Sequence, residues 1–139
     1  MKLVLIAILA LTGCVEAQAG GEAALPLDEA ALAPDFSKMD WVLTTIDGQP
    51  AGFSATMNLG EAGRAVGQAP CNRYSAAVTR QGTVFQFGPI AATRMACDQL
   101  KEEMAYFELL AKVTSAEGGY GFLTLKAGTH RLQFAQPID

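Results

Sequence analysis

The chain has 139 residues, a length that suits one domain of ordinary size. Its 14 Asp and Glu residues outnumber its 10 Lys and Arg residues, and the basic residues form no cluster. This mildly acidic balance argues against a nucleic acid as partner.

The first thirteen residues predict a signal peptide that ends in front of a lipidated cysteine. Lys2 supplies a positive charge, and an apolar run follows from Leu3 to Leu11. As a helix this run would reach roughly 13 Å, less than half of a ~30 Å hydrocarbon core, so it suits a secretory signal better than a membrane span. Leu11-Thr12-Gly13-Cys14 resembles a bacterial lipobox, in which the cysteine receives the lipid. The alternative is a plain secretory peptide with a chance cysteine near its cleavage site.

Lipidation of Cys14 would make acyl chains the membrane attachment, since no second long apolar run follows. Each buried CH₂ contributes ~0.8 kcal/mol, so two or three chains anchor a protein stably. Val15 follows Cys14 where an Asp would favour retention at the inner membrane. By resemblance to enterobacterial sorting, we expect the periplasmic side of the outer membrane. Residues 14–38, rich in Ala, Gly, Glu and Pro, predict a flexible tether before a domain at 39–139.

Two cysteines, Cys71 and Cys97, remain once Cys14 carries lipid. In an oxidising compartment they are candidates for a disulfide that closes a loop of about 25 residues and contributes ~3–4 kcal/mol. The alternative is a pair of buried free thiols that act as small hydrophobic residues. Because His130 is the single histidine, a zinc site would lack ligands, and we expect no metal and no other cofactor.

Stretches of strand type alternate with turn signals through most of the domain. They are Trp41–Ile46, Ala55–Leu59, Ala65–Gln68, Tyr74–Thr79, Thr83–Phe87, Tyr120–Leu125 and Thr129–Phe134. Phe85 and Phe87 fall on one face of their strand and are expected to point to the core.

One segment, Asp98–Val113, has the periodicity of a helix. Its expected core-facing stripe consists of Leu100, Met104, Phe107 and Ala111, with Leu110 beside them. Asp98 is the expected N-cap, and the Glu102-Glu103 pair reads as ordinary helix surface. Seven strands, one helix and no βαβ repeat predict an α+β fold, with a mostly antiparallel, partly closed sheet and the helix packed against one face or end.

Three segments of the domain stand out: WVLTTIDGQP from Trp41, CNRYS at Cys71–Ser75, and GPIAATRMAC at Gly88–Cys97, which precedes the helix that contains Glu103. Together they resemble the META/HslJ domain family. The resemblance covers roughly residues 39–134. It implies a small cracked β-barrel with one packed helix, similar to the pilotins of type III secretion. HslJ-like proteins are often envelope lipoproteins, which agrees with the signal peptide. The sequence departs from the pattern at Ala76, where a glycine often follows the serine.

The family-motif residues are Asn72, Arg73, Thr93 and Arg94, and the sequence suggests more than one role for them. Asn72 tolerates a positive φ and bonds local backbone, which favours a turn role. Arg73 and Arg94 either pair with carboxylates or form a small basic site.

No arrangement of nucleophile, base and orienting group is evident, and His130 shares a predicted strand face with Leu132 and Phe134, as a core or edge residue would. We therefore expect a non-catalytic protein. By resemblance, it is an envelope lipoprotein of stress tolerance or envelope integrity, with an envelope protein or a hydrophobic ligand as partner. The alternatives are a pilotin-like carrier of an outer-membrane client or acyl chain, and an inhibitor of a periplasmic hydrolase that presents loop Gly60–Arg64.

Overall fold

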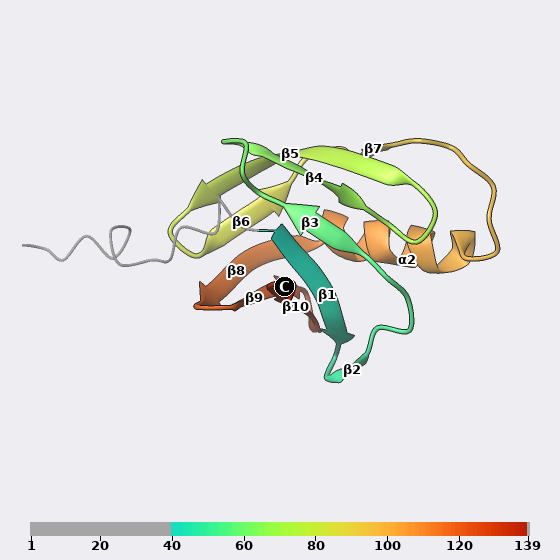
Figure 1. Cartoon of the computed structure of the whole chain (residues 1–139). Helices are drawn as coiled ribbons and strands as arrows, with labels where there is room; N and C mark the ends of the chain where they lie inside the picture. Colours follow the sequence, from blue (N-terminus) through green and yellow to red (C-terminus); the bar gives the residue numbers. More distant parts are fainter. Residues whose placement is uncertain (1–39, 139) are drawn as a thin grey trace, which may run out of the picture.

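The structure, a computed structural model, describes residues 40–138. The predicted signal peptide, Cys14 and the predicted tether lie outside these residues. The described chain forms strands β1 (Asp40–Ile46), β2 (Gln49–Pro50), β3 (Thr56–Asn58), β4 (Arg64–Gln68), β5 (Arg73–Gln81), β6 (Val84–Phe87), β7 (Ala91–Ala92), β8 (Val113–Gly119), β9 (Phe122–Ala127) and β10 (His130–Ala135), with helix α2 (Leu100–Ala111) between β7 and β8 (Figure 1).

The strands form one antiparallel sheet that closes into a barrel. Its order is β10-β9-β8-β6-β5-β4-β3-β1, and β1 pairs with β10 to complete the circle. The two-residue strands stand outside this circuit, β2 against β1 and β7 against β5. Figure 1 shows α2 lying beside the barrel. The predicted α+β fold, an antiparallel barrel with one packed helix, is confirmed.

The barrel has two weak seams. β3 pairs with β4 at the single position Asn58↔Val66, and β6 pairs with β8 at the single position Val84↔Ser115. By contrast, the β9–β10 ladder continues from His130↔Ala127 to Ala135↔Phe122. The sheet was expected to be partly closed. It is a closed barrel in which two of the strand pairings, β3–β4 and β6–β8, are only one residue pair long.

Strand alternation fills the barrel interior with large apolar side chains. On β1, Trp41 and Leu43 point inward, and Phe85 on β6 is 2% exposed, whereas Phe87 is half-buried. The largest fully buried side chains are Trp41, Met57, Tyr106, Leu110, Leu123, Leu125, Leu132 and Phe134. Each contributes about 1.5–3 kcal/mol when it leaves water. The interior is thus a packed core.

The predicted inward face of the helix is wrong in part, since Leu110 is buried as expected but Leu100, Met104 and Ala111 are exposed. The residues of α2 that are buried are Glu103, Tyr106 and Leu110, while Met104 is 64% exposed. Each buried residue precedes a residue of the expected stripe by one position in the sequence, so most of that stripe lies on the outer side of α2. Phe107 lies between the two faces and is half-buried. Nor does Asp98 cap the helix, because the N-cap residue is Gln99, which makes no side-chain capping bond.

All seven predicted strands exist, and β8 was missed between the helix and β9. Its sequence VTSAEGG lacks a run of β-branched or aromatic residues, so its strand form depends on pairing with β9. Tyr120, assigned to the next strand, lies in the β8–β9 turn and is 97% exposed. Within residues 40–138, no helix is long and apolar enough to cross a membrane.

Candidate functional site

The two motif segments meet at α2 through the carboxylate of Glu103. Its Oε2 accepts hydrogen bonds from the backbone N–H groups of Cys71 at 2.8 Å and Asn72 at 2.7 Å. Its Oε1 accepts one from Asn72 Nδ2 at 2.7 Å. Glu103 is 4% exposed and Asn72 is 2% exposed, so this contact is buried. Charge-assisted bonds of this kind are among the stronger ones in proteins. The prediction that Glu103 is ordinary helix surface is wrong.

Asn72 continues the network to the second motif segment. Its Oδ1 accepts hydrogen bonds from Thr93 Oγ1 at 3.0 Å and from the N–H of Met95 at 2.6 Å. Thr93 Oγ1 in turn accepts the N–H of Arg73 at 3.1 Å. Asp47 is the one non-glycine residue with positive φ among residues 40–138, so Asn72 does not have the φ of the expected turn role. Its side chain instead joins loop 69–72 to segment 93–95.

A disulfide between Cys71 and Cys97 ties the same two segments, with Cα atoms 5.9 Å apart. In the described part of the chain, no buried side-chain nitrogen or oxygen lacks a hydrogen-bond partner. Asn72, Thr93 and Glu103 therefore use their polar atoms to hold the chain together. Chemically, this cluster acts as a structural joint between the two motif segments and α2.

The two motif arginines have different surroundings. Both are exposed, and neither makes an ion pair with another residue in the range 40–138. Arg73 borders a groove of about 780 Å³ on the outer face of β1, β3, β4 and β5, together with Val42, Val66 and Ser75. The structure does not place Arg94 among the residues that line this groove. Arg73 thus borders this groove together with Asp40, and the basic site that the sequence allowed for it stays a prediction.

A glycine shapes the wall of this groove. At Gly67 a Cβ atom would collide with the carbonyl oxygen of Thr56 and lie 2.9 Å from the ring of Tyr74. The ring is held there because Tyr74 OH donates to that Thr56 oxygen at 2.7 Å and is 2.9 Å from Tyr106 OH. Burial raises the pKa of both tyrosines well above their usual value. The groove thus lies over a buried pair of hydrogen-bonded tyrosines.

A second groove, of about 530 Å³, runs along the outer side of α2. Phe87, Pro89 and Ile90 form one wall, and Met104 and Phe107 form the other. It is mainly apolar, with Glu108 at its edge. The helix stripe that the sequence assigned to the core therefore faces a surface groove.

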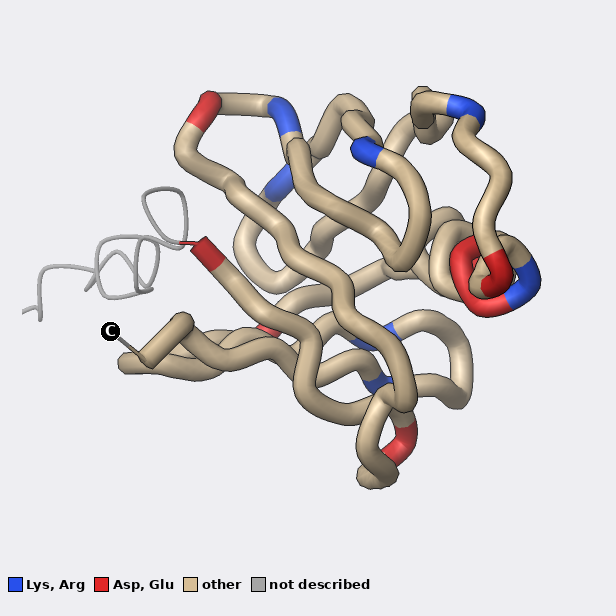
Figure 2. Tube along the Cα trace, turned by 45° about the vertical axis from the view of Figure 1, so that its right-hand side comes forward, with Lys and Arg blue, Asp and Glu red and all other residues tan. Residues whose placement is uncertain are grey.

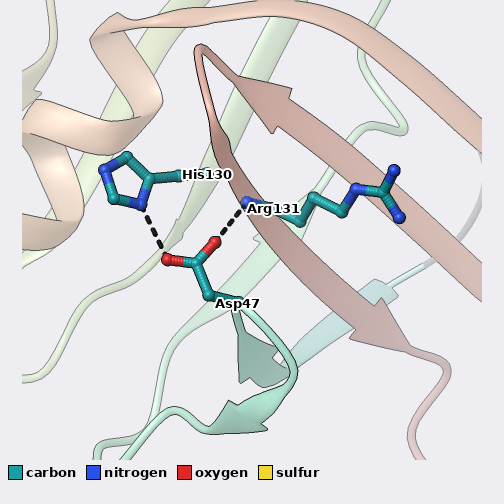
Figure 3. Close-up of polar contacts among 3 residues, drawn as sticks. All are labelled: Asp47, His130 and Arg131. Carbon is teal, nitrogen blue, oxygen red and sulfur yellow. Dashed lines mark hydrogen bonds and ion pairs between the residues drawn. The ribbon is translucent and has the colours of Figure 1, made fainter.

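Asp47 and His130 form a third feature, at the opposite end of β1 from Asp40. Asp47 Oδ2 lies 2.7 Å from His130 Nδ1, and Asp47 Oδ1 accepts the N–H of Arg131 at 2.8 Å (Figure 3). Two hydrogen bonds lower the pKa of the Asp47 carboxyl: the one from the His130 side chain has the larger effect, and the one from the Arg131 backbone the smaller. His130 is an exposed edge residue here. No group of three metal-ligating side chains occurs among residues 40–138, and this pair joins the β1–β2 and β9–β10 turns.

Sequence reasoning missed Glu103 as the centre of the network. The signal was present, because Glu103, Tyr106 and Leu110 follow the i, i+3, i+7 spacing of one helix face. A carboxylate on such a face indicates a buried partner.

Comparisons with solved structures show the same fold. The chain is similar to a protein from Burkholderia xenovorans whose NMR structure has 24% sequence identity and a TM-score of 0.61, over 75% of this chain and 85% of that one. A second NMR structure has 23% identity and a TM-score of 0.59, over 73% and 91%. A crystal structure of a DUF4847 family protein from Bacteroides vulgatus has 13% identity and a TM-score of 0.56, over 76% and 96%.

No curated protein matches the chain. The META domain family model matches residues 34–138, which is most of the chain and includes both motif segments. The barrel order, the single described helix and the joined CNRYS and TRMAC segments agree with that match. The resemblance seen in the sequence is confirmed: this chain belongs to the META domain family.

Proposed function

We propose that the protein is a non-catalytic lipoprotein of the bacterial envelope, whose META domain acts by binding in stress tolerance or envelope integrity. The observation that carries the proposal is that the polar side chains of the motif form hydrogen bonds within the protein. Asn72, Thr93 and Glu103 satisfy one another and the backbone, which leaves Arg73 and the groove beside it to contact a ligand. A domain whose motif residues hold its own segments together acts by presenting a binding surface, and it supplies no reacting group.

The envelope location is supported by the lipobox before Cys14 and by the Cys71–Cys97 pair, because disulfides persist in oxidising compartments. Metabolic labelling with a fatty acid analogue, followed by mass spectrometry of the N-terminal peptide, tests the lipid. We expect acyl chains on Cys14 in the wild type and none in Cys14→Ser. Density-gradient fractionation should place the wild type with the outer membrane. An unmodified Cys14, or a wild-type protein that stays with inner-membrane fractions, would contradict the corresponding part of the proposal.

The state of the cysteines has its own test. Protein taken from the native periplasm, alkylated without reduction and digested, should yield a linked Cys71–Cys97 peptide pair. Two alkylated thiols in that material would remove the disulfide as support for an oxidising compartment.

The stress role is tested in the native host. A deletion strain should survive heat or envelope damage less well than the wild type, and the wild-type gene should restore survival. Arg73→Ala should restore it poorly if the groove is the contact surface. Arg94→Ala is the matched control, because it removes an exposed motif arginine outside the groove lining. Equal restoration by the two variants would rule out the groove, and normal survival of the deletion strain would rule out the stress role.

A second candidate is a pilotin-like carrier of an outer-membrane client, which the apolar groove along α2 favours. Since the barrel interior is packed, a client segment or acyl chain would lie against Phe87, Ile90, Met104 and Phe107. Crosslinking of the lipidated protein in cells should then capture one client, and Met104→Glu should abolish the capture while Arg73→Ala leaves it intact. The reverse pattern would favour the groove at Arg73.

A further inference from the structure

Three large apolar side chains are exposed near the β8–β9 turn. Tyr120 is 97% exposed, Phe122 is 52% exposed and Ile138 is 100% exposed. The C-terminal segment lies beside the turn, because Gln136 donates its N–H to the carbonyl of Gly121 at 3.3 Å and Ala135 pairs with Phe122. These three residues therefore belong to one end of the barrel.

The described chain begins at this same end. Val42 pairs with Ala135, so Asp40 lies beside the segment that follows β10, and Asp40 and Pro137 line one groove. The side chain of Asn58 donates to Asp40 and fixes the start of β1. Figure 2 shows the start of β1 and the C-terminal end on one side of the molecule and α2 on the other side.

Two glycines in the β8–β9 hairpin keep its aromatic side chains at the surface. Gly121 has a φ of +81°, and a Cβ at Gly119 would collide with the ring of Phe122. Because both residues are glycines and carry no Cβ, the backbone can turn tightly at Gly121 and the Phe122 ring can lie over Gly119. The ring remains at the surface, and Tyr120 projects at the tip.

The tip is also poor in charge. Residues 118–122 are Gly-Gly-Tyr-Gly-Phe, and the acidic residue before them, Glu117, is paired with Lys126 at 2.8 Å. An uncharged tip brings no like charge to an anionic lipid surface. Tyrosine and phenylalanine suit the boundary between headgroups and acyl chains, because their rings are apolar and the tyrosine hydroxyl can remain hydrated.

We propose that this end of the barrel, the tip Tyr120–Phe122 with Ile138, contacts the phospholipid surface that holds the acyl chains of Cys14. The inference rests on the proposed lipidation. Residues 15–39 connect the lipid to the barrel at this end, so the tip is held at high effective concentration near the bilayer. A shallow contact is then sufficient, since the acyl chains supply the anchoring. The contact orients the domain with α2 and its apolar groove away from the membrane.

Depth-dependent fluorescence quenching tests the orientation. The lipidated Tyr120→Trp chain is reconstituted into phosphatidylethanolamine–phosphatidylglycerol vesicles that contain brominated phospholipid. Met104→Trp is the matched control, because it places a tryptophan at an exposed apolar position on α2, and the native Trp41 is fully buried in both. We expect the additional emission to be quenched at least about twofold more in Tyr120→Trp, because aromatic side chains insert at the interface. Equal quenching, or stronger quenching of Met104→Trp, would overturn the proposal.

A second arm does not depend on the lipid. The Cys14→Ser chain is titrated with the same vesicles to millimolar lipid, where Tyr120→Ser should lower the bound fraction about threefold and Met104→Ser should not. An equal effect of the two serine variants would refute the contact. A missing acyl mass on Cys14 would refute the proposed lipidation, and the serine variants would still decide whether the tip contacts lipid. A blue shift of Tyr120→Trp that rises with protein concentration without vesicles would identify a second copy as the occupant and overturn the membrane contact.

Discussion

Replacing the buried Glu103 carboxylate by its uncharged isostere should weaken the whole domain. In Glu103→Gln a single oxygen remains as acceptor, although three donors from Cys71 and Asn72 point at the carboxylate. Asn72 cannot reverse its amide to compensate, because its Oδ1 already accepts from Thr93 and Met95. At least one bond is therefore lost, and the others lose the assistance of the charge.

The magnitude follows from these three bonds. A hydrogen bond to a charged group contributes about 1.5–3 kcal/mol and a neutral one about 0.5–1.5 kcal/mol. Losing one bond and the charge on two others lowers the free energy of unfolding by about 3–5 kcal/mol, against about 5–15 kcal/mol for a typical domain. In urea, with a slope of about 1–3 kcal/mol/M, the midpoint should fall by about 1–5 M.

The assay is equilibrium urea unfolding of the oxidised protein, followed by circular dichroism. Glu102→Gln is the matched control, because it makes the same charge change at the adjacent, exposed position of α2. We expect its unfolding free energy to stay within about 0.5 kcal/mol of the wild type. Similar midpoints for the two variants would refute the view that Glu103 holds the motif segments together.

Two further predictions concern the wall of the Arg73 groove. Gly67→Ala should lower the free energy of unfolding by more than about 2 kcal/mol, since the new Cβ meets the Thr56 carbonyl, which is backbone and cannot give way. Gly88→Ala should be neutral or slightly stabilising in the same urea assay, because its Cβ meets nothing closer than 3.5 Å; equal losses would contradict the steric argument. Raised pKa values of Tyr74 and Tyr106 mean that unfolding releases their protons above pH ~10, so stability present below that pH is lost as pH rises. The loss is about 2.7 kcal/mol per pH unit for two groups, and ultraviolet titration should show both tyrosinates appearing together with unfolding; a tyrosinate signal from either residue in the folded protein would argue against it.

The sequence predicted the strands and the helix well because their signals are local. Strand alternation and turn residues fall within a few positions, and the helix signal needs only twelve residues. The inward face of α2 was wrong because both sides of this short helix carry apolar residues. Met104 and Phe107 are as apolar as Tyr106 and Leu110, and only packing against the barrel decides between them.

The site could be predicted only in part, for a related reason. The residue types of the motif, and the pairing of Cys71 with Cys97, are visible in the sequence. The burial of Glu103 is indicated only indirectly, by its shared helix face with Tyr106 and Leu110. The donors that make a buried carboxylate favourable come from a loop some thirty residues away, and the sequence does not pair them with it. Strand β8 was missed on the same ground, since its form comes from its partner β9.

The pairing of β1 with β10 has a consequence for how the chain is made. The first described strand pairs with the last, so the barrel cannot close until the ribosome has added Phe134 and Ala135. Contacts this far apart in sequence form slowly, because a long loop must be ordered first. A chain interrupted before β10 leaves the edges of β1 and β9 without their partner, and such edges invite aggregation and proteolysis. Late closure also keeps the growing polypeptide in an open state until its last strand has been made.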